Sequence, residues 1–195
     1  MRLLIKSLWH LLAIVGLAAV AAGGWFFSQG ISARTPPGEM ETVVARRARQ
    51  AMIPADARSR QNPESASAEA IRSGLEHWAD HCASCHANNG SGDTAIGRGL
   101  YPRTPDMRLA ETQTLSDGEL FYIIEHGVKL TGMPAWSTGI PEGETDSWHL
   151  VHFIRRLPRL TPEELEEMES LNPKPPAEIR EQIEEERFLR GEGNE

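Results

Sequence analysis

The sequence predicts an all-α protein, with one small folded domain and helical segments on both sides of it. Its 195 residues exceed one small domain without requiring two. Helix-start signals stand at Ser116-Asp117-Gly118-Glu119 and at Thr161-Pro162-Glu163-Glu164. The chain around the cysteines lacks the alternation of strands and helices expected of an α/β fold. We therefore expect short helices and loops rather than a sheet.

The charge distribution excludes nucleic acid as a partner. The formal net charge is −8, and residues 161–195 alone carry 12 acidic and 4 basic side chains. Binding to phosphates needs a net basic face, and the small cluster Arg46, Arg47 and Arg49 does not provide one.

Residues 1–33 predict a single transmembrane helix that anchors the chain. Arg2 and Lys6 precede the apolar run Leu8–Phe27, which has about the 20 residues that a helix needs to cross a bilayer. Basic residues before such a run place the N-terminus in the cytoplasm and the rest of the chain outside the bacterial cytoplasmic membrane, in the periplasm. A cleavable signal peptide, with Ser32-Ala33 as its site, is the alternative.

The two cysteines of the chain both lie in Cys82-Ala83-Ser84-Cys85-His86. Two thiols at this spacing can reach two vinyl groups on one porphyrin edge, while the following histidine presents its imidazole to the iron. The motif predicts one haem c, covalently attached through Cys82 and Cys85, with His86 as an axial ligand. A thiol oxidoreductase and a structural zinc site are the alternatives, but the first lacks an α/β pattern and the second lacks further ligands.

Met133 is the predicted second axial ligand. It lies in Thr131-Gly132-Met133-Pro134-Ala135-Trp136, where the flanking glycine and proline favour a loop. A thioether held on such a loop is a soft ligand for reduced iron. Packing in the core is the alternative role. Competing residues stand in less suitable contexts, and they are Met40, Met52, Met107, Met168 and His126.

The stretch Gly74–Leu157 resembles the small monohaem cytochrome c domain. Gly74-Leu75-Glu76-His77-Trp78 is similar to the Gly-x-x-x-aromatic motif of that family's first helix, and Asp146–Leu157 is similar to its last helix. The resemblance implies short helices wrapped around one covalent haem, with the first and last helices crossing closely at Gly74. In the family a proline carbonyl accepts a hydrogen bond from the haem-ligating imidazole, which implies Pro102, with Pro105 as the alternative.

Between these two helices we expect an irregular loop over Asn88–Leu100 and one short helix after Ser116. The apolar residues of that helix are expected to line the haem pocket, and they are Leu120, Phe121, Ile123 and Ile124. Candidates for hydrogen bonds to the haem propionates are Arg98, Arg103 and Trp136, with a solvated surface role as the alternative for the two arginines.

The chain divides into four predicted segments: the anchor 1–33, a linker 34–68 partly docked on the domain, the cytochrome c domain 69–160, and an acidic helical tail 161–195. The linker contains a helical stretch over Glu39–Met52. Asn172–Pro176 breaks the tail, and a second helix is expected over Ala177–Arg190. Docking of this tail on a basic partner is a hypothesis, with a solvated helix as the alternative.

The resemblance implies a single-electron carrier rather than an enzyme. A haem with both axial positions filled has no open site for chemistry, so electron exchange with redox protein partners remains. No pair of carboxylates, nucleophile with base, or phosphate loop in the sequence indicates catalysis. The alternatives are a haem-based gas or redox sensor and a haem subunit of a larger membrane oxidoreductase complex.

Overall fold

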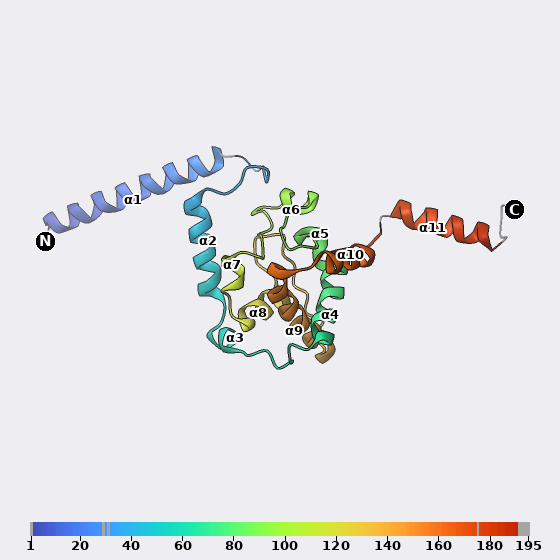
Figure 1. Cartoon of the computed structure of the whole chain (residues 1–195). Helices are drawn as coiled ribbons and strands as arrows, with labels where there is room; N and C mark the ends of the chain where they lie inside the picture. The colour runs from blue at the N-terminus through green and yellow to red at the C-terminus, as the bar shows by residue number, and fades with distance from the viewer. Residues whose placement is uncertain (1, 29, 31, 175, 191–195) are drawn as a thin grey trace. The chain divides into compact units, whose positions relative to one another are not determined.

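The structure is a computed structural model, and it describes residues 2–28, 30, 32–174 and 176–190 (Figure 1). Within these residues every regular element is a helix and no strand is present, which confirms the predicted all-α class. The chain forms two compact units, Met1–Thr35 and Pro36–Glu195.

The first unit contains helix α1, Arg2–Ser28. The apolar run is thus helical, and side chains such as Trp9, Leu17 and Val20 are exposed. Across the described residues, no helix combines the length and the apolar character needed to cross a membrane, so the predicted transmembrane helix is not supported.

The second unit begins with α2, Glu39–Met52, and α3, Ala55–Ser59. Helix α2 begins and ends where the helical stretch is predicted. The segment around α3 is docked on the domain: the Ser116 hydroxyl donates to the carbonyl of Arg58 at 2.8 Å, and the Asn62 amide donates to the carbonyl of Trp148 at 3.1 Å. Ile53, between the two helices, is only 3% exposed.

The core is built on the crossing of α4, Ala68–His77, with α9, Pro141–Arg156. At Gly74 a Cβ atom would lie 2.3 Å from the carbonyl oxygen of His149 and 2.8 Å from Cβ of Phe153. Only a residue without a side chain permits this approach, so the predicted close crossing at Gly74 is confirmed. Helix α4 starts at Ser67, whose hydroxyl accepts a hydrogen bond from the Ala70 amide at 3.0 Å.

Helix α8, Asp117–His126, packs beside α9 and has the predicted capping box. The Ser116 hydroxyl accepts from the Glu119 amide at 3.1 Å, and the Glu119 carboxylate accepts from the Ser116 amide at 2.8 Å. Phe121 is 4% exposed and stacks on Trp148 with ring centroids 4.0 Å apart. This side chain therefore serves the contact between α8 and α9.

Two short helices lie where the sequence predicts loops. Helix α6, Ala95–Gly99, begins after Thr94, whose hydroxyl accepts from the Gly97 amide at 2.8 Å. Helix α7 spans Ala110–Gln113. The prediction of an irregular loop over Asn88–Leu100 was wrong for the residues of α6. There the threonine cap outweighs the low helix propensity of the glycines.

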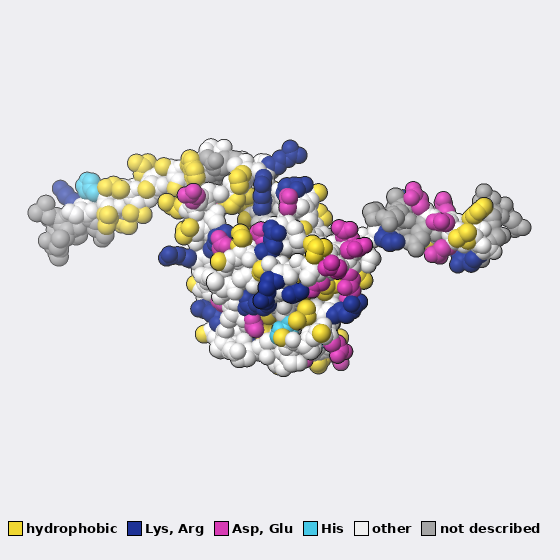
Figure 2. All heavy atoms as spheres, in the orientation of Figure 1, with side chains coloured by type: hydrophobic (Ala, Val, Ile, Leu, Met, Phe, Trp, Pro, Cys, Tyr) yellow, Lys and Arg dark blue, Asp and Glu magenta, His cyan; other side chains and the backbone are white. Residues whose placement is uncertain are grey.

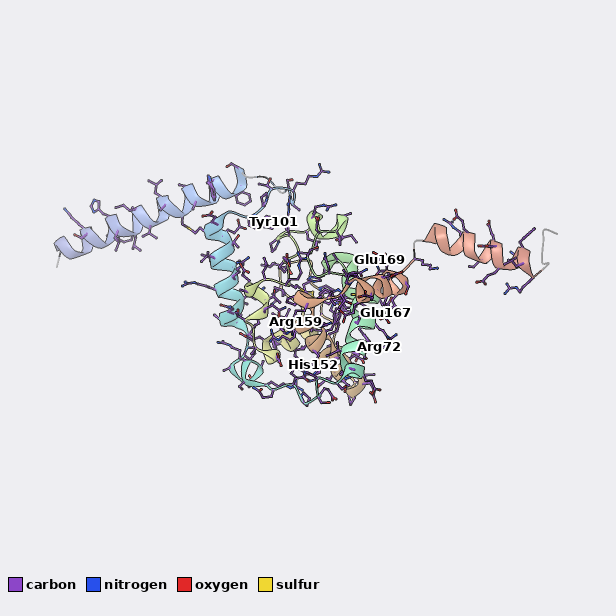
Figure 3. The ribbon with its side chains drawn as sticks, viewed as in Figure 1. Arg72, Tyr101, His152, Arg159, Glu167 and Glu169 are labelled. Atoms are coloured by element: carbon purple, nitrogen blue, oxygen red, sulfur yellow. The ribbon has the colours of Figure 1, made fainter. Side chains whose placement is uncertain are left out.

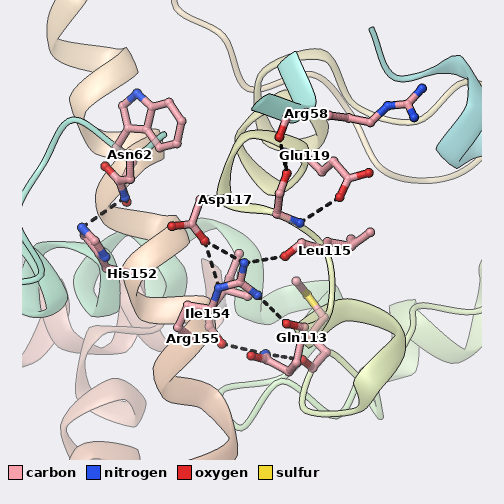
Figure 4. A network of polar contacts seen from close by, with 12 residues as sticks. Arg58, Asn62, Gln113, Leu115, Asp117, Glu119, His152, Ile154 and Arg155 are labelled. Carbon is pink, nitrogen blue, oxygen red and sulfur yellow. Dashed lines mark hydrogen bonds and ion pairs between the residues drawn. The ribbon is translucent and has the colours of Figure 1, made fainter. Parts of the chain in front are cut away.

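A network around Arg155 of α9 holds the connection between α7 and α8 (Figure 4). Its guanidinium donates to Asp117 at 2.7 Å, to the carbonyl of Gln113 at 2.8 Å and to that of Leu115 at 2.6 Å. The Gln113 amide in turn donates to the carbonyl of Ile154 at 2.9 Å.

After the 3-10 turn η2, Leu157–Arg159, the tail forms α10, Pro162–Leu171, and α11, Pro176–Leu189. The predicted break between two helices is present. Helix α10 packs on the domain, because Met168 is fully buried and Arg72 pairs with Glu167 at 2.6 Å (Figure 3). Acidic side chains gather on the surface over α10 (Figure 2). Its other face belongs to the core, which the acidic composition did not indicate.

Candidate functional site

The two cysteines and His86 lie on a short helical segment that follows α4. The π-helical turn η1 spans Trp78–Cys82, and α5 spans Ala83–His86. Both cysteines are free thiols. The chain then leaves the helix at Ala87, a non-glycine residue with φ of 61°.

Trp78 holds this turn in place. Its indole N–H donates to the carbonyl of Ala87 at 3.0 Å, and its ring, 2% exposed, packs against the rings of His86 and Phe153 with centroids 5.5 and 5.7 Å away. The aromatic residue of the predicted Gly-x-x-x-aromatic motif therefore supports the haem motif directly.

The segment after the motif wraps tightly around it. The Gly92 amide donates to the carbonyl of His86 at 2.8 Å, and the Thr94 hydroxyl donates to that of Cys85 at 3.3 Å. At Gly97 a Cβ would lie 2.5 Å from the carbonyl oxygen of Cys85. Sequence reasoning missed these residues, although the helix-capping threonine before Ala95-Ile96-Gly97 was a usable signal.

His86 has the properties of a metal ligand. Burial lowers the pKa of its imidazole from 6.5 to about 4, so the ring is neutral at neutral pH and has a lone pair to donate. Its Nδ1 atom is buried and has no hydrogen-bond partner among the described residues. Buried polar atoms are almost always paired in native proteins, so this orphaned nitrogen fits a site that also binds a group other than the chain itself.

The pKa of Cys82 argues against a thiol oxidoreductase. Burial, followed by the nearby Cys85, raises the pKa of Cys82 to about 12. A thiol oxidoreductase needs a lowered pKa, because the thiolate is its nucleophile. The zinc alternative also lacks support, since the described part of the chain contains no group of three or more metal-binding side chains.

Met133 lies, half-buried, in an irregular loop, and that loop is fastened to the end of α8. The amide of Trp136 donates to the carbonyl of Ile124 at 3.0 Å, and that of Ser137 donates to Glu125 at 3.2 Å. These carbonyls belong to the last turn of the helix, where no intrahelical partner is available. The Val128 amide closes the loop by donating to the carbonyl of Met133 at 3.1 Å.

The loop that carries Met133 also contacts the residues before the cysteine motif and the residues that follow α6. On one side the ring of Trp136 meets His81, next to Cys82, edge to face with centroids 5.4 Å apart. On the other, a Cβ at Gly132 would lie 2.6 Å from the Leu100 side chain, just beyond α6. The loop that carries Met133 therefore lies against the segments on both sides of the cysteine motif.

The structure does not assign the predicted proline contact. Pro102 is exposed, and His86 Nδ1 bonds to neither proline. The carbonyl oxygen of Pro105, the alternative, lies 3.0 Å from the position of a Cβ at Gly92, in the loop that follows the motif. Pro105 thus lies against the loop that follows the cysteine motif.

The remaining candidates lie at the periphery. Arg98 and Asp93 form an exposed ion pair. Trp136 is 36% exposed. His126, the rival distal ligand, stacks on Tyr122 with centroids 4.2 Å apart and bonds through Nδ1 to the carbonyl of the same residue at 3.1 Å. This ring is already occupied by a neighbour on its own helix.

Comparison with known proteins assigns the segment that contains these residues to a family. Residues 69–154 match the model of the family described as "Cytochrome C oxidase, cbb3-type, subunit III". No curated protein matches the chain. The matched stretch runs from α4 into α9 and contains the cysteine motif and the methionine loop. It is a c-type cytochrome domain.

Proposed function

We propose that this protein is a single-electron carrier whose haem c is attached to Cys82 and Cys85 and ligated by His86 and Met133. The observation that carries the proposal is the buried, neutral imidazole of His86, with its orphaned Nδ1, in a cysteine motif that the methionine loop contacts. Soft thioether and imidazole ligands together favour the reduced iron and keep both axial positions filled.

The bound haem supplies a reversible one-electron couple. The chain contributes rigidity: Trp78 fastens the turn after His86, and two amides fasten the Met133 loop to α8. Ligands held in place by the fold need little rearrangement when the charge changes. Because nothing else on the domain indicates bond-making chemistry, exchange with redox protein partners is the proposed activity.

The absorption spectrum of the oxidised protein tests the ligand pair. A weak charge-transfer band near the red end reports sulfur bound to ferric haem. We expect it to vanish in Met133→Ala and to persist in Met107→Ala, a partly buried methionine packed against the core. Persistence of the band in Met133→Ala would exclude this ligand.

Carbon monoxide separates the carrier from the alternative, a gas sensor. A carrier with a firmly held methionine leaves the reduced iron closed, so we expect no spectral change on adding carbon monoxide to the wild type and a clear change in Met133→Ala. Rapid binding to the wild type would favour the sensor.

A second candidate function is membership in an oxidase complex. The name of the matched family describes a subunit of a cytochrome c oxidase, which favours assembly of this domain with larger membrane proteins. Extraction in mild detergent followed by copurification tests it. Recovery of the protein free of stable partners would leave the independent carrier.

We further propose that residues 1–33 direct the haem domain outside the cytoplasmic membrane and attach it there. The basic residues before the apolar run and the exposed apolar side chains of α1 support this. Fractionation of bacterial cells, with sequencing of the mature N-terminus, tests both steps. A mature protein that begins near Ala33 would show that the N-terminal segment is cleaved and does not attach the domain to the membrane.

A further inference from the structure

Helix α2 is amphipathic, and it turns its polar face, rather than its apolar face, toward the domain. On one face lie Thr42, Arg46 and Arg49, which follow the spacing of successive helical turns. The opposite face is an apolar stripe, and its members are Met40, Val43, Val44, Ala48 and Ala51, with Arg47 among them. A surface helix ordinarily turns its apolar stripe toward the core.

The polar face is the one that meets the domain. The guanidinium of Arg46 pairs with the carboxylate of Glu111 on α7 at 3.3 Å, and Glu41 accepts a hydrogen bond from the Tyr101 hydroxyl. Thr42 and Arg49 are partly buried, and Nε of Arg49 is enclosed. Because these contacts are polar, burial of apolar area does not explain how α2 is oriented.

The apolar stripe faces away from the domain. Met40 is 82% exposed, Val43 51% and Val44 61%. Arg47 is exposed as well, and no partner for its guanidinium is found in the described part of the chain. A contiguous apolar stripe left on the outside of a docked helix marks a surface that binds something else.

We propose that this stripe of α2 lies on the surface of an anionic phospholipid bilayer. The apolar side chains would enter the boundary between headgroups and acyl chains, and Arg47, in their midst, would extend to lipid phosphates. In this arrangement the positive charge of Arg47 and the apolar side chains of the stripe both contribute to binding the bilayer.

Protein occupants fit the stripe less well. A second copy packed stripe to stripe would bring two Arg47 guanidinium groups together in an apolar contact, which is unfavourable. A stable protein interface buries about 800 Å² on each partner, more than these few side chains offer. A bilayer needs no such closed interface, since basic residues near anionic lipids add their own attraction.

Oxidation of Met40 by hydrogen peroxide, followed by mass spectrometry, tests the proposal on the full-length, haem-loaded protein. Vesicles of phosphatidylcholine mixed with phosphatidylglycerol are compared with vesicles of phosphatidylcholine alone. We expect oxidation of Met40 to slow at least fivefold on the anionic vesicles only. The readout does not depend on the haem ligands, so it remains informative if the proposed electron transfer is wrong.

Matched variants identify the residues responsible. Val43→Ser with Val44→Ser should abolish the protection of Met40, whereas Ile183→Ser, at a side chain 49% exposed on α11, should leave it. Arg47→Gln should weaken protection, whereas Arg187→Gln, at an exposed arginine of α11, should leave it.

Three results would overturn the proposal. Equal protection on both kinds of vesicle would mean that charge plays no part. Protection without lipid that grows with protein concentration would identify a second copy as the occupant. Unchanged oxidation under all conditions would mean that the stripe contacts no membrane.

Discussion

Replacing Gly74 by alanine is expected to force α4 and α9 apart. The new Cβ would lie 2.3 Å from the carbonyl oxygen of His149, whereas ordinary contacts at such positions are 3.4–4 Å, so the helices must separate by about 1 Å. Overpacking of this kind costs up to about 3 kcal/mol. Alanine returns at most about 1 kcal/mol through its better helix propensity. The net destabilisation is therefore about 2 kcal/mol.

Thermal unfolding of the haem-loaded protein, followed by circular dichroism at helical wavelengths, measures this loss. For a domain of this size about 2 kcal/mol corresponds to a fall in Tm of roughly 8 °C. Gly99→Ala is the matched control, because nothing lies within 4 Å of a Cβ at that helical position, and its Tm should shift by no more than roughly 4 °C. An unchanged Tm for Gly74→Ala would refute the argument that the missing side chain sets the distance between the helices.

Three further perturbations test other parts of the fold. Arg155→Ala removes the hydrogen bonds to Asp117 and two backbone carbonyls, and should cost about 2 kcal/mol in urea unfolding; a cost like that of an ordinary surface arginine would contradict the network. Trp78→Phe keeps an aromatic ring but removes the indole N–H, which leaves the Ala87 carbonyl without its donor, so we expect a loss of at least about 1 kcal/mol and slower haem attachment in cells. In the haem-free chain, His86 has its pKa lowered from 6.5 to about 4, so the unfolded state binds more protons between these values. Stability should then fall by about 3 kcal/mol as the pH drops from 6.5 to 4, and His86→Gln should flatten this part of the profile.

Tertiary contacts supply what the sequence-based expectations left open. The linker was expected to be partly docked on the domain, and the contacts that hold it join distant residues: Asn62 bonds to His152, 90 positions away, and Ser116 to Arg58, 58 positions away. Likewise, the acidic composition of α10 concealed the core position of Met168. A local pattern reports which side chains stand on one face of an element, but not which other element covers that face.

The sequence by itself predicted the haem chemistry that is proposed for the site, and it determined the helix crossing beneath it. The spacing of the two cysteines decides whether both thiols can reach one porphyrin, and the residue type at position 74 decides whether two helices can approach closely. Both are properties of a few neighbouring residues, so the sequence suffices to predict them. Only the tertiary structure decided that the Met133 loop is fastened to the last turn of α8 and that α2 docks through its polar face. Both depend on contacts between segments that are distant in the sequence. The free energy of these contacts is divided among many weak interactions, so no single motif predicts them.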